Sequence, residues 1–125
     1  MSITVCVYAA YMQSSRWSPW RPFPHPRQRG VLHAPLGPGV YDLRNAKTGE
    51  PILFGIGGRC ALRMTSLLPK PWGSGTRNNS KKRNYLKRHL KDIEYRTMAC
   101  DSREQAVDLE RAIKRERGHE YRFGT

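Results

Sequence analysis

Glu110 is a carboxylate in a helical pattern whose other members are apolar. Ala106, Leu109 and Ile113 recur at steps of three and four and mark the side that should be buried, and Glu110 falls on the same stripe. Burying a carboxylate without a partner is costly, so Glu110 needs a cation, a hydrogen-bond donor or a bound proton. An ion pair with one of the many arginines would meet that need, and so would a divalent metal ion. The spacing leaves both interpretations open.

The stretch from residue 37 to residue 63 holds a tyrosine, a glycine-rich strand end and an arginine in an order that chemistry could use. Two short apolar runs, VYDL and PILFGI, are separated by a polar segment and predict a β-hairpin, with Tyr41 on its first strand. Apolar residues then recur at helical spacing over residues 59–68. This short helix would carry Arg63.

The strongest electrostatic feature is the stretch from Arg77 to Lys91, which contains seven lysines and arginines and no acid. Asn78, Asn79 or Ser80 can cap a helix there. Free backbone amides at a helix start beside a row of cations form an anion site, whereas the alternative is an ordinary solvated helix. Because no acid alternates with the cations, we expect them to contact the phosphates of a nucleic acid. The residues predicted to do so are Arg77, Lys81, Lys82, Arg83, Lys87 and Arg88.

The chain has 125 residues and a formal net charge of +13. Its length suits one domain plus, at most, a tail. The charge predicts an anionic partner, and nucleic acid, DNA in particular, is favoured over a membrane because there is neither a long amphipathic basic helix nor a lipidation signal. No signal peptide or membrane span is expected. The three widely separated cysteines fit reduced thiols in a cytoplasmic protein, and the oligomeric state stays open.

Residues 1–36 are expected to form an N-terminal extension or arm, and residues 37–125 to form the domain. Frequent prolines keep the extension out of regular helix, and Trp17, Trp20 and Phe23 alternate with arginines there. Such an arm can stack on the bases of a nucleic acid, dock a partner, or pack its aromatic side chains on the domain. We favour packing on the domain.

The order of these features resembles the GIY-YIG nuclease superfamily over roughly residues 37–125. The first motif of that family matches Gly39-Val40-Tyr41, its helical arginine matches Arg63, and its metal-binding glutamate matches Glu110 within AVDLERAIK. Each motif alone is weak, but their order makes the resemblance moderately specific.

The chain departs from the family at two motifs. The second motif places its glycine at Gly55 and its tyrosine at Leu53, and the alternative register, Gly55-Ile56-Gly57, supplies no tyrosine either. The final motif is met by Tyr121, but Arg122 stands where asparagine is expected. One hydroxyl of the family's site is therefore lost.

Another group would have to replace that hydroxyl, and the basic stretch offers His89 or Lys81. Tyr121 is a further auxiliary candidate. The alternative for His89 is an ordinary residue on a helix face.

The resemblance implies an α+β fold, with a small three-stranded antiparallel sheet flanked by about three helices. The sequence patterns predict the same strands, near residues 39–44, 51–56 and 93–99. A helix follows the last strand, and Ser102 with Gln105 forms a capping-box pattern at its start.

The resemblance also implies hydrolysis of phosphodiester bonds in DNA with Mg²⁺ or Mn²⁺. Tyr41 would be the base or the group that positions the attacking water, Arg63 would hold the scissile phosphate, and Glu110 would bind the metal. A hypothesis from a different class is a non-catalytic, basic nucleic-acid-binding module.

Overall fold

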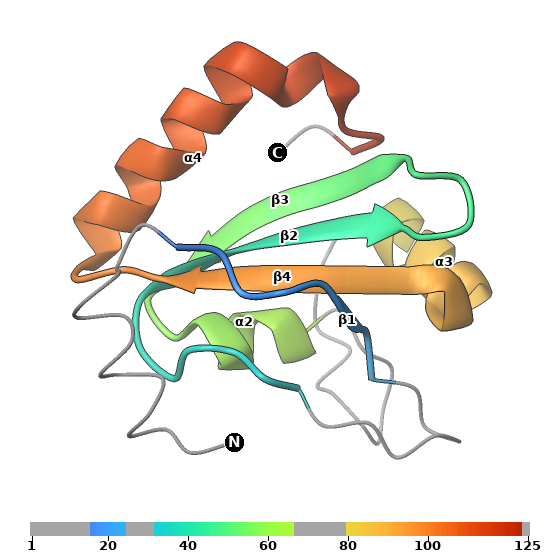
Figure 1. Ribbon diagram of the computed structural model, residues 1–125, viewed down its shortest axis with the longest axis horizontal. Coiled ribbons are helices and arrows are strands. Elements are labelled where there is room, and N and C mark those ends of the chain that lie inside the picture. The colour runs from blue at the N-terminus through green and yellow to red at the C-terminus, as the bar shows by residue number, and fades with distance from the viewer. Residues whose placement is uncertain (1–15, 25–31, 67–79, 124–125) are drawn as a thin grey trace.

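The computed structural model describes residues 16–24, 32–66 and 80–123 of the chain. The elements, in chain order, are β1 (Arg21–Pro22), β2 (Gly39–Asn45), β3 (Pro51–Gly57), α2 (Cys60–Thr65), α3 (Ser80–His89), η2 (Leu90–Asp92), β4 (Ile93–Ala99), α4 (Arg103–Arg117) and η3 (Gly118–Glu120). The strands form one antiparallel sheet in the order β1-β4-β2-β3 (Figure 1).

The predicted α+β class is confirmed, and the three predicted strands occur with their ends within one residue of expectation. Two details differ. The sheet gains β1, a two-residue strand from the extension that carries no alternating pattern to announce it. Helix α2 begins one residue later than predicted, and the hydroxyl and the backbone N–H of Ser66 both donate to the carbonyl of Arg63 and close its last turn. Residues 67 and 68 of the predicted helix lie outside the described residues.

The hairpin between β2 and β3 is fixed by its turn residues. The side-chain oxygen of Asn45 accepts hydrogen bonds from the backbone N–H groups of Lys47 and Thr48, at 3.0 and 3.2 Å. Gly49 has φ of 78°, a left-handed conformation that glycine adopts without strain. The turn therefore sets the register in which Tyr41 faces Gly55 across the two strands.

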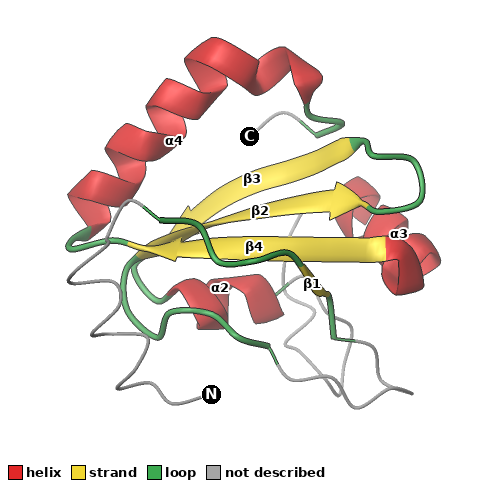
Figure 2. Cartoon of the chain, viewed as in Figure 1, coloured by secondary structure: helices red, strands yellow, loops and turns green. Residues whose placement is uncertain are grey.

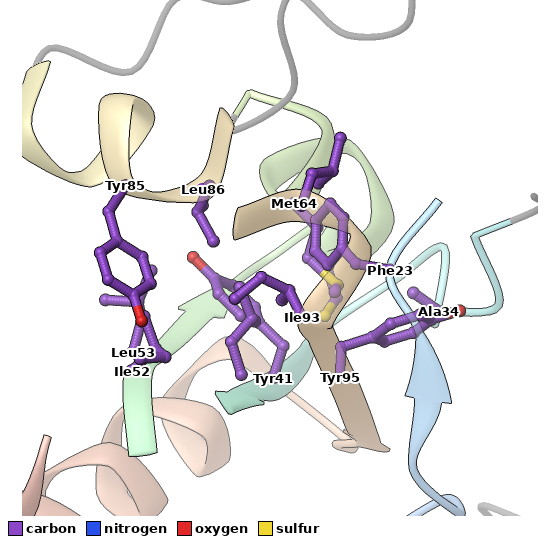
Figure 3. Close-up of a cluster of buried hydrophobic side chains, with 13 residues drawn as sticks. Phe23, Ala34, Tyr41, Ile52, Leu53, Met64, Tyr85, Leu86, Ile93 and Tyr95 are labelled. Atoms are coloured by element: carbon purple, nitrogen blue, oxygen red, sulfur yellow. The ribbon is translucent and has the colours of Figure 1, made fainter. Parts of the chain in front are cut away.

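The sheet is covered on both faces. Helix α4 lies along one face and α2 lies on the other, with α3 near the start of β4 (Figures 1 and 2). One apolar cluster fills the space between the sheet and helices α2 and α3, and Tyr41, Met64 and Leu86 belong to it (Figure 3). The second cluster lies under α4 and includes Val40 and Ala106.

The described part of the extension packs on the domain, as we favoured. Phe23 is buried in the first cluster. The guanidinium carbon of Arg96 lies 4.3 Å from the centroid of the Trp17 ring, and that of Arg44 lies 4.0 Å from the Trp20 ring. These aromatic side chains are engaged with the sheet and do not form a free stacking platform.

The predicted capping box at the start of α4 is present. The hydroxyl of Ser102 accepts a hydrogen bond from the backbone N–H of Gln105 at 3.1 Å. The Gln105 side chain in turn accepts from the backbone N–H of Asp101 at 2.6 Å. This cap fixes where α4 begins and hence which of its side chains face β3.

Candidate active site

An open cleft of about 840 Å³ lies along β3 between α2 and α4. Because β3 stands at the end of the strand order, no further strand of the described chain covers its outer edge. The lining residues come from β2, β3, α2, α3, α4 and the turns after β3 and α2: Tyr41, Leu53, Phe54, Gly55, Ile56, Gly57, Gly58, Arg59, Leu62, Arg63, Ser66, Lys82, Arg103 and Glu110.

The three residues predicted to be catalytic all line this cleft. Tyr41 comes from β2, Arg63 from α2 and Glu110 from α4. Their separation in sequence means that only the fold of the sheet and helices can place them together.

Tyr41 forms part of the floor of the cleft, and only 1% of its surface is exposed. Its ring lies across Gly55, because a Cβ built on Gly55 would stand 2.3 Å from both Cζ and Oη of Tyr41. Only glycine leaves room for the ring at this position. Gly55 thus places the phenol of Tyr41.

Arg63 is exposed on α2 at the wall of the cleft. A Cβ on Gly57 would lie 2.9 Å from the Cβ of Arg63, so Gly57 allows α2 to lie close to the end of β3. The two glycines of PILFGIG therefore bring Tyr41 and Arg63 close to the same strand.

Glu110 reaches the cleft from α4 and is also paired with a cation. Its carboxylate oxygen Oε1 lies 3.7 Å from Nζ of Lys114, one helical turn further on, and 20% of its side chain is exposed. Of the two interpretations that the sequence left open, the ion pair is present, and its partner is a lysine. Because Glu110 also lines the cleft, its carboxylate can reach a metal ion bound there.

Positive charge dominates the lining of the cleft. Arg59, Arg63, Lys82 and Arg103 contribute four cations, against the single carboxylate of Glu110. An anionic ligand fits this balance.

Sequence reasoning missed Arg59 and Arg103, although the spacing of Arg103 from Glu110 signals the second of them. Arg103 precedes Glu110 by seven residues, so it lies on the same side of α4 as Glu110. Arg59 is the residue before α2, four positions before Arg63.

The resemblance places the tyrosine of the second motif at Leu53, and the structure offers no hydroxyl at that position. Leu53 lines the cleft and is buried. The one other hydroxyl of the described lining belongs to Ser66, and it donates to the carbonyl of Arg63 at 2.6 Å. Ser66 thus holds the end of α2 and does not substitute for the missing tyrosine.

The predicted phosphate-binding residues divide into two groups. Lys81, Lys87 and Arg88 are exposed on α3, as the prediction requires, whereas Arg83 is partly buried. Lys82, and not the auxiliary candidate Lys81, turns into the cleft. Arg77 lies outside the described residues.

The other auxiliary candidates lie away from the cleft. The ring of His89 lies against Tyr85, with centroids 4.4 Å apart, so His89 is a residue of the helix face. The hydroxyl of Tyr121 donates to Oδ1 of Asp42 at 2.9 Å on the face of the sheet that α4 covers. Neither side chain lines the cleft.

Asp42 and Tyr121 form a buried polar pair with Arg96. The guanidinium of Arg96 donates to Oδ2 of Asp42 at 3.1 Å. Burial raises the pKa of Asp42, and the hydrogen bond from Tyr121 and the charge of Arg96 oppose that rise only in part. Burial and the neighbouring carboxylate raise the pKa of Tyr121 as well, so its hydroxyl keeps the proton that it donates. This pair is structural.

Within the described ranges, no three His, Cys, Asp or Glu side chains are grouped to hold a metal ion. A metal at this cleft would therefore depend on Glu110, water and substrate oxygens.

None of the helices among the described residues has the length and apolar character that a membrane span requires. Comparison of the chain with models of protein families, with curated proteins and with solved structures found no match.

Proposed function

We propose that the chain is a divalent-metal-dependent endonuclease that hydrolyses phosphodiester bonds in DNA, as its resemblance to the GIY-YIG superfamily implies. The observation that carries this proposal is the meeting of Tyr41, Arg63 and Glu110 at one cationic cleft. Tyr41 packs in the core under α2 and α3, Arg63 lies on α2 and Glu110 lies on α4, and the three border the same hollow around β3, the edge strand of the sheet.

Arg63 is the group that holds the scissile phosphate. Its guanidinium is planar and permanently charged, so it can donate two parallel hydrogen bonds to phosphate oxygens. Fixed positive charge at this point stabilises the negative charge that develops on the phosphate in the transition state.

Tyr41 positions the attacking water through its hydroxyl at the floor of the cleft. Because the ring of Tyr41 lies across Gly55 on the neighbouring strand, the hydroxyl is held in a fixed place beside β3.

The donor set at the cleft fits magnesium or manganese. Mg²⁺ in enzymes of this kind is held by one or two carboxylates together with water and substrate oxygens, and Glu110 supplies one carboxylate at the cleft. When bound, the ion supplies positive charge at the phosphate and activates water. Glu110 is the residue of this chain that would hold it.

Helix α3 extends the binding surface beyond the cleft. Lys82 lines the cleft from the first turn of α3, and Lys81, Lys87 and Arg88 lie exposed along the same helix. Lys81 and Arg88 are two turns apart on one exposed side of α3, and this spacing suits the phosphates of a DNA strand that leaves the cleft along α3.

The second candidate function is a non-catalytic DNA-binding module of the same fold. The ion pair between Glu110 and Lys114 favours it, because a paired carboxylate needs no metal. Leu53 favours it too, because it removes a hydroxyl on which the family's chemistry relies.

A cleavage assay with Mg²⁺ on linear, branched and single-stranded DNA separates the two candidates. The nuclease proposal predicts that wild-type protein cuts at least one substrate and that Glu110→Gln does not, while both bind DNA with similar affinity. Glu116→Gln is the matched control, since Glu116 is exposed on α4 and does not line the cleft. Binding without cutting by the wild-type protein, over the full range of substrates and with Mn²⁺ as well, would favour the binding module.

A further inference from the structure

The end of the cleft beside Gly58 holds two arginines that the proposed chemistry does not use. Arg59 follows Gly58 directly, and the Cδ of Arg103 lies 3.7 Å from the place that a Cβ on Gly58 would occupy. Arg59 thus stands next to Gly58 in the chain, just before α2, and Arg103 approaches the same glycine from the start of α4. Both are exposed and both line the cleft.

Neither arginine has a side-chain hydrogen bond or ion pair with another described residue. The nearest acids in sequence to Arg103, Asp101 and Glu104, are themselves exposed. Glu104 does not face Arg103, because consecutive residues of a helix point in different directions. Two guanidinium groups thus share one end of a cleft without a carboxylate between them, and an anion is the partner that their charge favours.

The position of this pair relative to the candidate centre follows from where the two residues stand in the chain. Arg103 stands two turns before Glu110 on α4, or about 10 Å along the axis, and Arg59 is the residue before α2, four positions before Arg63. Both arginines lie at the Gly58 end of the cleft, so the phosphate that they would hold is a neighbour of the one at Arg63.

An apolar residue, Leu62, lies between Arg59 and Arg63 in the sequence. Leu62 is 61% exposed and lines the cleft. A free inorganic anion gains nothing from this contact, whereas a sugar between two phosphates can pack on it.

We propose that Arg59 and Arg103 form a second phosphate subsite, which binds the phosphodiester next to the one that is cut. Leu62 contacts the sugar between the two phosphates. This inference rests on the proposed nuclease function. It adds a substrate requirement, namely that the bond to be cut must be flanked by a charged phosphodiester on the Gly58 side of the cleft.

The test is a DNA substrate in which one phosphate at a time, on either side of the cut, is replaced by a neutral methylphosphonate. We expect wild-type protein to cut about ten- to a hundredfold more slowly when one particular flanking phosphate is neutral, as removal of a charged hydrogen bond implies. The R59A/R103A variant should cut the unmodified DNA more slowly by a similar factor. Making that same phosphate neutral should then not slow the variant any further. Arg115→Ala is the matched control, because Arg115 is exposed on α4 and does not line the cleft.

If a neutral phosphate slows R59A/R103A as much as it slows the wild-type protein at every flanking position, the subsite is overturned. This outcome leaves the nuclease proposal standing, because the wild-type protein still cuts DNA. If no protein cuts DNA, the nuclease proposal fails and the subsite is judged from binding alone. The slope of log affinity against log salt should then be shallower by about 0.9 in R59A/R103A and unchanged in Arg115→Ala, because the double variant neutralises one phosphate fewer. An unchanged slope in R59A/R103A would overturn the subsite.

Discussion

Gly55→Ala is the substitution that best tests how the fold places Tyr41. The added Cβ would lie 2.3 Å from Cζ and Oη of Tyr41, whereas ordinary contacts begin at 3.4 Å, so the ring must retreat by about 1.1 Å (3.4 − 2.3). Gly55 has no left-handed backbone angle, so alanine fits the strand itself. The consequence of the substitution is therefore displacement of the phenol.

The size of the effect follows from that displacement. Moving a reacting group by 1 Å can slow catalysis by about a hundredfold. Overpacking a core costs about 1–3 kcal/mol, and replacing a strand glycine by alanine returns about 0.5–1 kcal/mol, so the free energy of unfolding should fall by up to about 2.5 kcal/mol. DNA affinity should stay near the wild-type value, because the cations that line the cleft are untouched.

The assay is a single-turnover cleavage rate together with denaturant unfolding. Gly118→Ala is the control, because a Cβ there meets nothing closer than 3.8 Å. Tyr41→Leu should relieve the clash, so that Gly55→Ala costs less stability in the Tyr41→Leu background than alone. The reasoning is refuted if the two substitutions add in stability, or if Gly55→Ala cuts at the wild-type rate while Tyr41→Phe is inactive.

Three further predictions concern the surface and the core. Log affinity for DNA should fall linearly with log salt, and replacing Lys87 and Arg88 by alanine should lower the slope by roughly 0.9 for each phosphate that is no longer neutralised; an unchanged slope would remove α3 from the binding surface. Tyr121→Phe should lower the free energy of unfolding by about 1.5–3 kcal/mol, because it leaves an oxygen of the buried Asp42 without its donor, and denaturant unfolding at neutral pH measures this loss. Burial raises the pKa of the Cys60 thiol to about 12, so in a variant whose other cysteines are serine it should resist alkylation at pH 8 until the protein unfolds, and rapid alkylation of the folded protein would contradict the buried position.

Local patterns in the sequence were sufficient for most of the fold. Two apolar runs and the polar segment between them predicted the strands of the hairpin, and Ser102 with Gln105 predicted the start of α4. Strand β1 could not be predicted in this way, because it has two residues and exists only through pairing with β4, more than seventy residues further along the chain.

Which side chains enter the cleft depends on the exact start of each helix and on contacts between distant segments, and the periodicity of the sequence does not determine either. Three residues could have capped α3, and a shift of one residue turns a helix by about 100°, which decides whether Lys81 or Lys82 enters the cleft. The ion-pair partner of Glu110 is Lys114 and not one of the arginines, and its spacing of four residues was visible in the sequence. The approach of Arg103 to Gly58 joins α4 to the end of β3, and no local pattern signals a contact of that kind.

The central claim is that Tyr41, Arg63 and Glu110 act as one catalytic site. The most direct test is the single-turnover rate of DNA cleavage by Tyr41→Phe, Arg63→Ala and Glu110→Gln, each alone and all combined. We predict that each single variant is slower by about a hundred- to a thousandfold, and that the triple variant is scarcely slower than the slowest single one, because residues that act as a unit are not additive. Wild-type rates in Arg63→Ala or Glu110→Gln, or losses that multiply across the three positions, would contradict the claim.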